Sequence, residues 1–305
     1  MGLSKKYTTK VYLDMNIFER IIKENLDKDL LKNIKINADI EYYISVGHAE
    51  EVYKAKKNDI NNENCDENLK RYNLISSLRT KGILNPSDNK IKNKPESFED
   101  AYERVEKYDT QNNIKFIGDN NSKVQEGTFK EYLSNNKNMK NYSNLNEQQI
   151  WEMAEVKNEL NKIQERLEAD NITLKNDLYP LMINEWGFTP LQAEKIIKKK
   201  QISSNISLLK NCFDTISNDF KLLEFSIEFL HEVLNKCGYN RDKGSKVTSG
   251  IYDTTHSIYA TYCDYFVTND EKLKKRVKAI YHYLGVRTKV INFDEFTSMF
   301  VKKND

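Results

Sequence analysis

The chain has 305 residues, which allows a substantial buried core and one large or two modest domains. Charged residues make up 31% of it and the formal net charge is only +2, so the overall charge does not indicate a polyanionic partner. No apolar run reaches the roughly 18 residues of a membrane-spanning helix, and the N-terminus lacks the apolar core of a secretion signal. The four cysteines are scattered, which excludes a zinc ribbon, so we expect reduced thiols in a cytoplasmic protein with no membrane contact.

The first predicted strand is the apolar run at residues 10–13, which Asp14 follows directly. Apolar side chains at helical spacing then run from Ile17 to Leu26 and predict a helix. Asp14 therefore lies at a strand-to-helix junction. Either Asp14 or Asn16 can also simply cap this helix, because both residue types accept backbone N–H bonds.

A second strand is predicted at residues 40–45, followed by a helix over residues 46–57. Ser45, His48 and Glu51 are spaced at i, i+3 and i+6 and share roughly one face of this helix. Glu50 is the alternative acid at this point. We favour Glu51 because it shares the face of His48.

The middle of the chain differs in composition. Beyond Lys56 the sequence becomes polar and rich in Asn, and residues 66–205 are predicted to be mostly helical. One long amphipathic helix is expected over residues 147–170, loops over 110–144, and a further helix from Thr189. Residues 59–205 are therefore expected to form a mainly α-helical insertion.

The C-terminal part returns to alternating patterns. Helices are predicted over residues 206–237 and from Ile251, and Asp253 lies at the start of the second. Residues 265–267 form an apolar strand, and Asp270 follows it. A helix then ends at Gly285, and residues 286–293 form the last strand.

Short strands that alternate with helices predict an α/β fold around a mostly parallel sheet. Both ends of the chain contribute strands. We therefore expect one domain built from residues 1–58 and 206–305, with residues 59–205 inserted between its halves.

Four acids have comparable positions at the ends of predicted strands and the starts of helices: Asp14, Glu51, Asp253 and Asp270. In a parallel sheet such positions face one crevice, so the four can converge. Clustered carboxylates repel one another unless a cation compensates, and oxygen ligands suit Mg²⁺ or Mn²⁺. Such ions activate water for attack on a phosphodiester.

Three segments resemble the PIN-domain nucleases: VYLDMN, SVGHAEEV and D-x-x-H-x-x-Y-A-x-x-CDYFVTND-x-x-L. The resemblance covers residues 8–58 and 206–296, and departs from the family in having Cys263 where a small residue is usual. It implies a three-layer α/β/α sandwich and metal-dependent cleavage of single-stranded or structured RNA. It also implies that four residues are both catalytic and metal-binding: Asp14, Glu51, Asp253 and Asp270.

Further residues accompany these acids. We expect His48 and His256 to hydrogen-bond the carboxylates. Direct contact to phosphate or proton donation is the next alternative, and packing unrelated to the site is the last. Asn16 and Asn269 either hydrogen-bond a phosphate or serve turns. Asp264 precedes its strand and is expected to be structural.

Runs of basic residues are candidate binding sites for RNA phosphates, although such a run is by default the solvent-exposed face of a helix. The run after Asp270 has the better claim over those at 54–57 and 195–200 because it begins beside the site. Its residues are Lys272, Lys274, Lys275 and Arg276.

Other hypotheses remain open. A PIN-like fold that has lost catalysis and acts through its insertion is the main alternative, and DNA is not excluded as substrate. A ferritin-like di-metal bundle is disfavoured because its Glu-x-x-His pattern is reversed at His48 and altered at Asp253. A role as a toxin or phage-defence effector rests on family analogy, and a regulatory protein partner or a homo-oligomer is left open.

Overall fold

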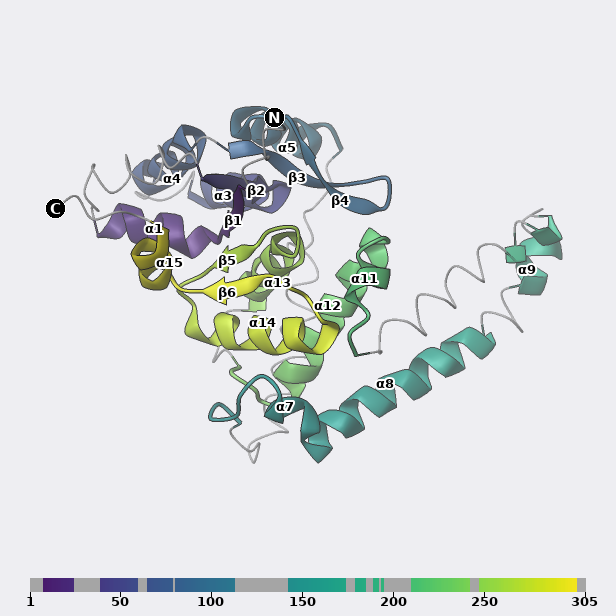
Figure 1. The fold of residues 1–305 in the computed structure, drawn as a ribbon. Helices are drawn as coiled ribbons and strands as arrows, with labels where there is room; N and C mark the ends of the chain where they lie inside the picture. The colour runs from purple at the N-terminus through teal and green to yellow at the C-terminus, as the bar shows by residue number, and fades with distance from the viewer. Residues whose placement is uncertain are drawn as a thin grey trace, which may run out of the picture.

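The computed structural model describes residues 8–24, 39–59, 65–78, 80–112, 142–173, 179–184, 189–191, 193–194, 210–241 and 247–300. It is an α/β fold around one six-stranded sheet with strand order β4-β3-β2-β1-β5-β6 (Figure 1). All neighbouring strands are parallel except the β3–β4 pair. The predicted α/β class and mostly parallel sheet are therefore confirmed.

The strands are β1 (Thr9–Leu13), β2 (Ile40–Ser45), β3 (Thr80–Ser87), β4 (Lys90–Lys94), β5 (Tyr265–Val267) and β6 (Lys289–Ile291). The helices of the N-terminal half are α1 (Met15–Lys23), α3 (Val46–Asp59), α4 (Cys65–Ser77) and α5 (Phe98–Asn112). Further along are α7 (Gln149–Glu152), α8 (Ala154–Thr173), α9 (Tyr179–Asn184) and α11 (Phe213–Ile216). The last four helices are α12 (Phe220–Lys236), α13 (Val247–Ala260), α14 (Glu271–Leu284) and α15 (Phe293–Phe300).

Two hydrophobic cores lie on opposite faces of the sheet, because successive side chains of a strand point to opposite faces. In β1, Val11 and Leu13 belong to the core that packs under α1, α3, α4, α5 and α15. Tyr12 between them belongs to the other core, which α12, α13 and α14 cover. Helices thus pack on both faces of the sheet (Figure 1).

The sheet joins the two ends of the chain. Strand β1 lies between β2 and β5, which are more than two hundred residues apart in sequence. The expectation that both termini supply strands to one sheet is confirmed. The division into two domains stays a prediction.

Residues 80–94 differ from the prediction, which placed them in a helical insertion. They form the β3–β4 hairpin and extend the same sheet beside β2. The turn uses Asp88 and Asn89 at positive φ, which these two residue types tolerate. Strand β4 reads KIKNK and lies at the sheet edge, where charged residues are usual, so it lacks the apolar pattern by which strands are recognised.

The long helix predicted at residues 147–170 is broken. Helix α7 ends at Glu152, the backbone of Met153 is extended, and α8 starts at Ala154. Trp151 of α7 is buried, and its indole Nε1 donates to the Ala279 carbonyl of α14 at 2.9 Å. Anchoring this side chain on α14 fixes α7 separately from α8, which extends away from the sheet (Figure 1).

Three further sequence predictions concern residues outside the described ranges: most of the 110–144 loops, the basic run at 195–200 and much of the helix from Thr189. Among the residues that the structure describes, no helix is both long and apolar enough to cross a lipid bilayer.

Candidate functional site

Asp14 lies at the carboxyl end of β1. Leu13 is in register with Val267 of β5, so the residues that follow these strands, Asp14 and Thr268, are neighbours. The Asp14 side chain is buried; its Oδ1 accepts from the Met15 N–H at 2.8 Å and its Oδ2 from the Thr268 hydroxyl at 2.7 Å. Asp14 therefore caps α1, as the alternative interpretation expected, and is also a buried carboxylate at the sheet edge.

Asn16 and Asn269 hold the two strand ends together. Asn16 Nδ2 donates to Asp14 Oδ2 at 2.5 Å and to the Thr268 hydroxyl at 2.9 Å. The Asn269 N–H donates to Asn16 Oδ1 at 3.0 Å. Both asparagines thus make the turn contacts that the simpler interpretation predicted. Thr268 was missed from sequence, although a hydroxyl residue between an apolar strand and a capping Asp is a readable signal.

Asp270 caps α14. Its Oδ1 accepts from the N–H groups of Lys272 at 2.8 Å and Leu273 at 2.9 Å. Its own N–H donates to the Thr268 hydroxyl at 3.2 Å, which links it to Asp14. The structure therefore fixes the orientation of this carboxylate before any ligand arrives.

Asp253 on α13 lies close enough to these two acids to feel their charge. Burial and the negative charge of Asp14 raise its pKa to about 8, with a further rise from Asp270 and a lowering by Arg276. The same effects act on Asp14: burial raises its pKa to about 6, His256 lowers it, and Glu51 raises it. The four acids predicted from sequence therefore interact at one end of the sheet.

His256 joins Glu51 to this cluster. Its Nε2 lies 3.1 Å from Glu51 Oε2 and 3.9 Å from Asp14 Oδ1. Burial alone lowers the pKa of His256, but the bond to Glu51 and the charges of the surrounding acids outweigh it, so the pKa is raised. His256 thus bonds a site carboxylate, as the sequence predicted.

Tyr12, which was not predicted as a site residue, hydrogen-bonds His256. Its hydroxyl lies 2.7 Å from His256 Nδ1 and 2.7 Å from Ser45 Oγ, in a buried position. Burial raises the pKa of this phenol well above its usual value, so it is neutral. Because Tyr12 holds Nδ1, the other ring nitrogen of His256 is directed toward Glu51.

His48 does not fulfil its predicted role beside the carboxylates. Its Nε2 donates to the Leu13 carbonyl at 2.8 Å, and its Nδ1 accepts from the Ser45 N–H at 3.1 Å. Burial, together with the charge of His256, lowers its pKa well below the usual value. His48 is therefore a neutral residue that joins β1 to the start of α3.

The choice between Glu50 and Glu51 is also clear. Glu51 contacts His256, whereas Glu50 lies close enough to Arg104 to feel its charge. Burial raises the pKa of Glu50, and Arg104 and His256 lower it. Glu51 is thus the acid that belongs to the cluster.

The predicted RNA-binding run divides. Arg276 is only 2% exposed; its guanidinium donates to the Asn240 carbonyl at 2.9 Å and lies 3.9 Å from Asp253. The prediction that Arg276 binds phosphate at the surface is therefore wrong, because Arg276 is a buried cation beside the acids. The other side chains of the run are half-buried or exposed; Lys274 bonds Glu271, and Lys275 donates to the Ser143 carbonyl. Lys272 is half-buried.

Asp264 is structural, as expected. Its carboxylate accepts from the Lys10 N–H at 2.8 Å and its N–H donates to the Lys10 carbonyl. It lies at the amino end of β5, opposite the edge that carries Asp270.

Gly47 sets the distance between α3, which carries Glu51, and α13, which carries His256. A Cβ at this position would lie 3.1 Å from Thr255 Cγ2 and 3.2 Å from Ser45 Oγ. Helix propensity alone favours Ala over Gly by roughly 1 kcal/mol. We expect Gly47→Ala to destabilise the chain instead, by about 1 kcal/mol, because the two helices must separate. Urea denaturation measures this, and a gain in stability would contradict it.

The cluster has the donor chemistry of a site for a divalent cation. Within the described ranges, no group of three or more His, Cys, Asp or Glu side chains is spaced to hold a metal ion as it stands. The donors themselves fit: the four acids offer oxygen, and burial, together with the negative charge of neighbouring acids, raises the pKa of Asp14 and Asp253. A divalent cation would relieve the repulsion between these charges.

The chain was compared with known proteins. It matches no protein-family model, no curated protein and no solved structure at a significant level.

Proposed function

We propose that the chain is a metal-dependent endoribonuclease with a PIN-like fold. The observation that carries the proposal is the convergence of Asp14, Glu51, Asp253 and Asp270 at one edge of a parallel sheet. Two of these acids come from each end of the chain. Burying Asp14 and Asp253 beside other acids costs free energy that a purely structural cluster has no reason to keep. The resemblance of the flanking motifs to PIN-domain nucleases agrees with it.

The residues have distinct tasks in this proposal. Bound Mg²⁺ or Mn²⁺ would supply an activated water and a Lewis acid for the phosphodiester. Asp14 and Asp270 would bind the ions with carboxylates whose orientation the helix caps already fix. Asp253 completes the acid set. His256, held by Tyr12, keeps Glu51 directed toward Asp14.

The test is cleavage of a single-stranded RNA by the purified chain with Mg²⁺, with Mn²⁺ and with EDTA. We expect cleavage with either ion, none with EDTA, and recovery when the ion is restored. A single-stranded DNA of the same sequence distinguishes the two substrates. Cleavage that persists in EDTA would contradict the metal dependence, and no cleavage with any ion would favour the alternative of an inactive PIN-like binding module.

A further inference from the structure

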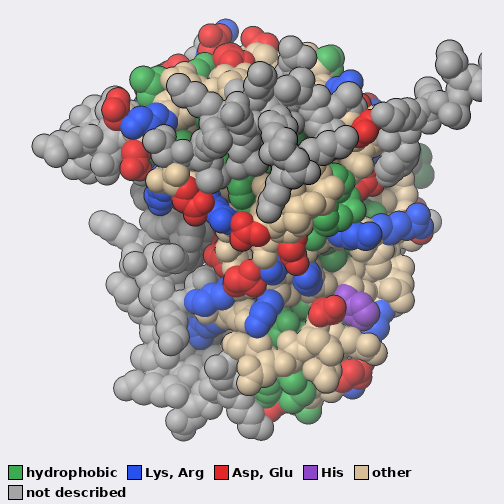
Figure 2. All heavy atoms as spheres, turned by 60° about the vertical axis from the view of Figure 1, so that its left-hand side comes forward, with side chains coloured by type: hydrophobic (Ala, Val, Ile, Leu, Met, Phe, Trp, Pro, Cys, Tyr) green, Lys and Arg blue, Asp and Glu red, His purple; other side chains and the backbone are tan. Residues whose placement is uncertain are grey.

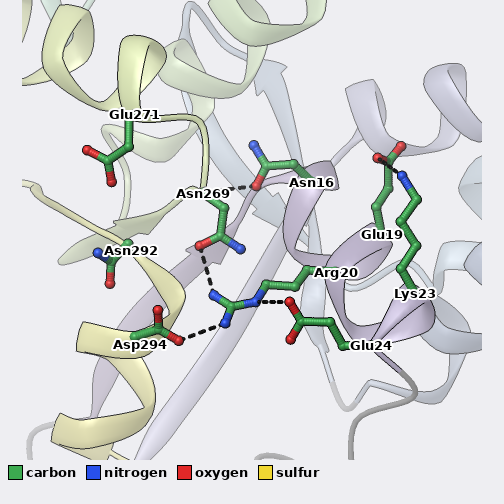
Figure 3. Close-up of a pocket in the computed structure, with 9 residues that line it drawn as sticks. All are labelled: Asn16, Glu19, Arg20, Lys23, Glu24, Asn269, Glu271, Asn292 and Asp294. Carbon is green, nitrogen blue, oxygen red and sulfur yellow. Dashed lines mark hydrogen bonds and ion pairs between the residues drawn. The ribbon is translucent and has the colours of Figure 1, made fainter.

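A cavity of about 470 Å³ adjoins the acid cluster on the side of α1. Asn16 and Asn269 line it, and Asn16 also donates to Asp14, so the cavity and the cluster share a wall. Its other walls come from α1, the start of α14 and the start of α15 (Figure 3). A molecule bound in the cavity would lie next to the proposed reaction centre.

Arg20 occupies the middle of this cavity in a fixed orientation (Figure 3). Its Nε donates to Glu24 at 2.9 Å, one terminal nitrogen to Asp294 at 2.9 Å, and the other to Asn269 Oδ1 at 3.5 Å. Its central carbon lies 5.4 Å from the centroid of the Phe293 ring. Because each nitrogen already donates a bond at the edge of the group, Arg20 offers a ligand chiefly its flat face.

The side-chain amides of Asn269 and Asn292 also line the cavity. Asn269 Oδ1 accepts from the Phe293 N–H at 3.2 Å and from Arg20, so its Nδ2 faces the other way. That nitrogen is buried and has no hydrogen-bond partner among the described residues. Asn292 Oδ1 accepts from the Glu295 N–H at 2.8 Å and caps α15, which leaves the Asn292 amide nitrogen as a donor.

The charges of the lining disfavour phosphate. Four acidic side chains and two basic ones border the cavity. On the face of the molecule that carries α1 and α15, basic and acidic side chains intermingle and form no continuous basic patch among the described residues (Figure 2). A neutral planar ligand with acceptors at its edge fits this lining better than an anion does.

We propose that this cavity binds one nucleobase of a single-stranded nucleic acid whose adjoining phosphodiester lies at the acid cluster. A base stacks on the guanidinium plane of Arg20, and its edge accepts a hydrogen bond from the amide of Asn292. The proposal rests on the proposed nuclease function, since that function supplies the ligand class. It adds that substrate is held through a base as well as through phosphates.

The test compares two fluorescent RNA octamers of equal charge, one complete and one with every base removed, in binding to the full chain in EDTA. Arg20→Lys keeps the positive charge and loses the plane. We expect it to weaken binding of the complete octamer about 5- to 50-fold and that of the abasic octamer less than about 2-fold. Asn292→Ser keeps the helix cap and should weaken the complete octamer about 2- to 10-fold. The same binding measurements are made with a complete and an abasic DNA octamer.

Arg104→Lys is the matched control, because Arg104 lies on α5, outside this cavity, and bonds Glu96. Equal effects on both octamers, no effect, or no binding of the complete octamer would overturn the base site. Failure of the nuclease proposal looks different: the binding pattern would hold while Mg²⁺ and Mn²⁺ produce no cleavage. Conversely, if the native chain cleaves RNA with metal and Arg20→Lys binds both octamers as the native chain does, the base site is wrong and the nuclease proposal stands.

Discussion

The Asp253→Asn variant is expected to be more stable than the native chain at pH 8 and to lose its metal-dependent cleavage. Burial and the charges of Asp14 and Asp270 raise the pKa of Asp253 to about 8, so ionising it in the folded chain costs free energy. An amide of the same shape avoids that cost and gives up a proposed metal ligand. We expect a gain of about 2 to 5 kcal/mol in the free energy of unfolding without metal, and a rate loss of about 100-fold or more.

The sign of this effect depends on pH. The folded pKa of about 8 lies above the unfolded value of about 3.9. At low pH, below the unfolded pKa, both states are protonated and the variant gains nothing. As pH rises toward 8, the native chain loses stability because its unfolded state ionises first. The advantage of Asp253→Asn should therefore grow from acidic to alkaline pH, in urea denaturation with EDTA.

Metal supplies the second readout. Mn²⁺ at pH 8 should stabilise the native chain, since it binds only the folded state, and should stabilise Asp253→Asn much less. Asp264→Asn is the matched control, because this acid lies at the other end of β5 and can keep its bond from Lys10 as an amide. It should keep cleavage and gain no stability. If Asp253→Asn destabilises the chain at pH 8, the ionised Asp253 carboxylate does not destabilise the folded chain, and the prediction is wrong.

The positions of the site acids were predictable because they depend on local pattern and on one rule of sheet geometry. Asp14 and Asp270 directly follow short apolar runs, and the carboxyl ends of adjacent parallel strands meet at one edge. The register between Leu13 and Val267 brings them together through Thr268. Capping and membership of the cluster were treated as rivals from sequence, whereas one carboxylate does both.

The burial of Arg276 was not predictable, since a basic run gives no indication of which side faces the core. Arg276 follows Leu273 by three residues and shares the buried face of α14, while Lys275 beside it is exposed. His48 similarly looked like a site residue because it shares a helix face with Glu51. Its ring instead donates to the carbonyl of Leu13, at the end of the neighbouring strand β1.

The structure also revises what the middle of the chain contributes. Residues 80–94 carry Gly82 at positive φ, where an added Cβ would lie 2.0 Å from the Lys94 carbonyl. This close approach of two strands is a contact between residues distant in sequence, which periodicity does not reveal. The hairpin extends the sheet on the β2 side, away from Asp270, so it widens the scaffold without adding to the acid cluster.

Replacing Arg276 by Met is expected to destabilise the chain by about 3 kcal/mol, because it removes a buried cation that an acid and a carbonyl depend on. Asp253 would lose the charge that lowers its pKa, and the Asn240 carbonyl would lose its donor. Lys275→Met, one residue earlier on the exposed face of α14, should change stability by no more than about 0.5 kcal/mol.

A double-mutant cycle separates the charge from the packing of Arg276. With Asp253→Asn in the background, Arg276→Met should cost less by about 0.5 to 3 kcal/mol, since no carboxylate is left to stabilise. The remaining cost reports the bond to Asn240. Arg276→Lys should recover part of the charge effect but not that bond, because a compact ammonium lacks the forked donors of a guanidinium. Urea denaturation at pH 8 in EDTA measures all four corners. Additive costs would show that Arg276 supports the fold without acting on the acid cluster.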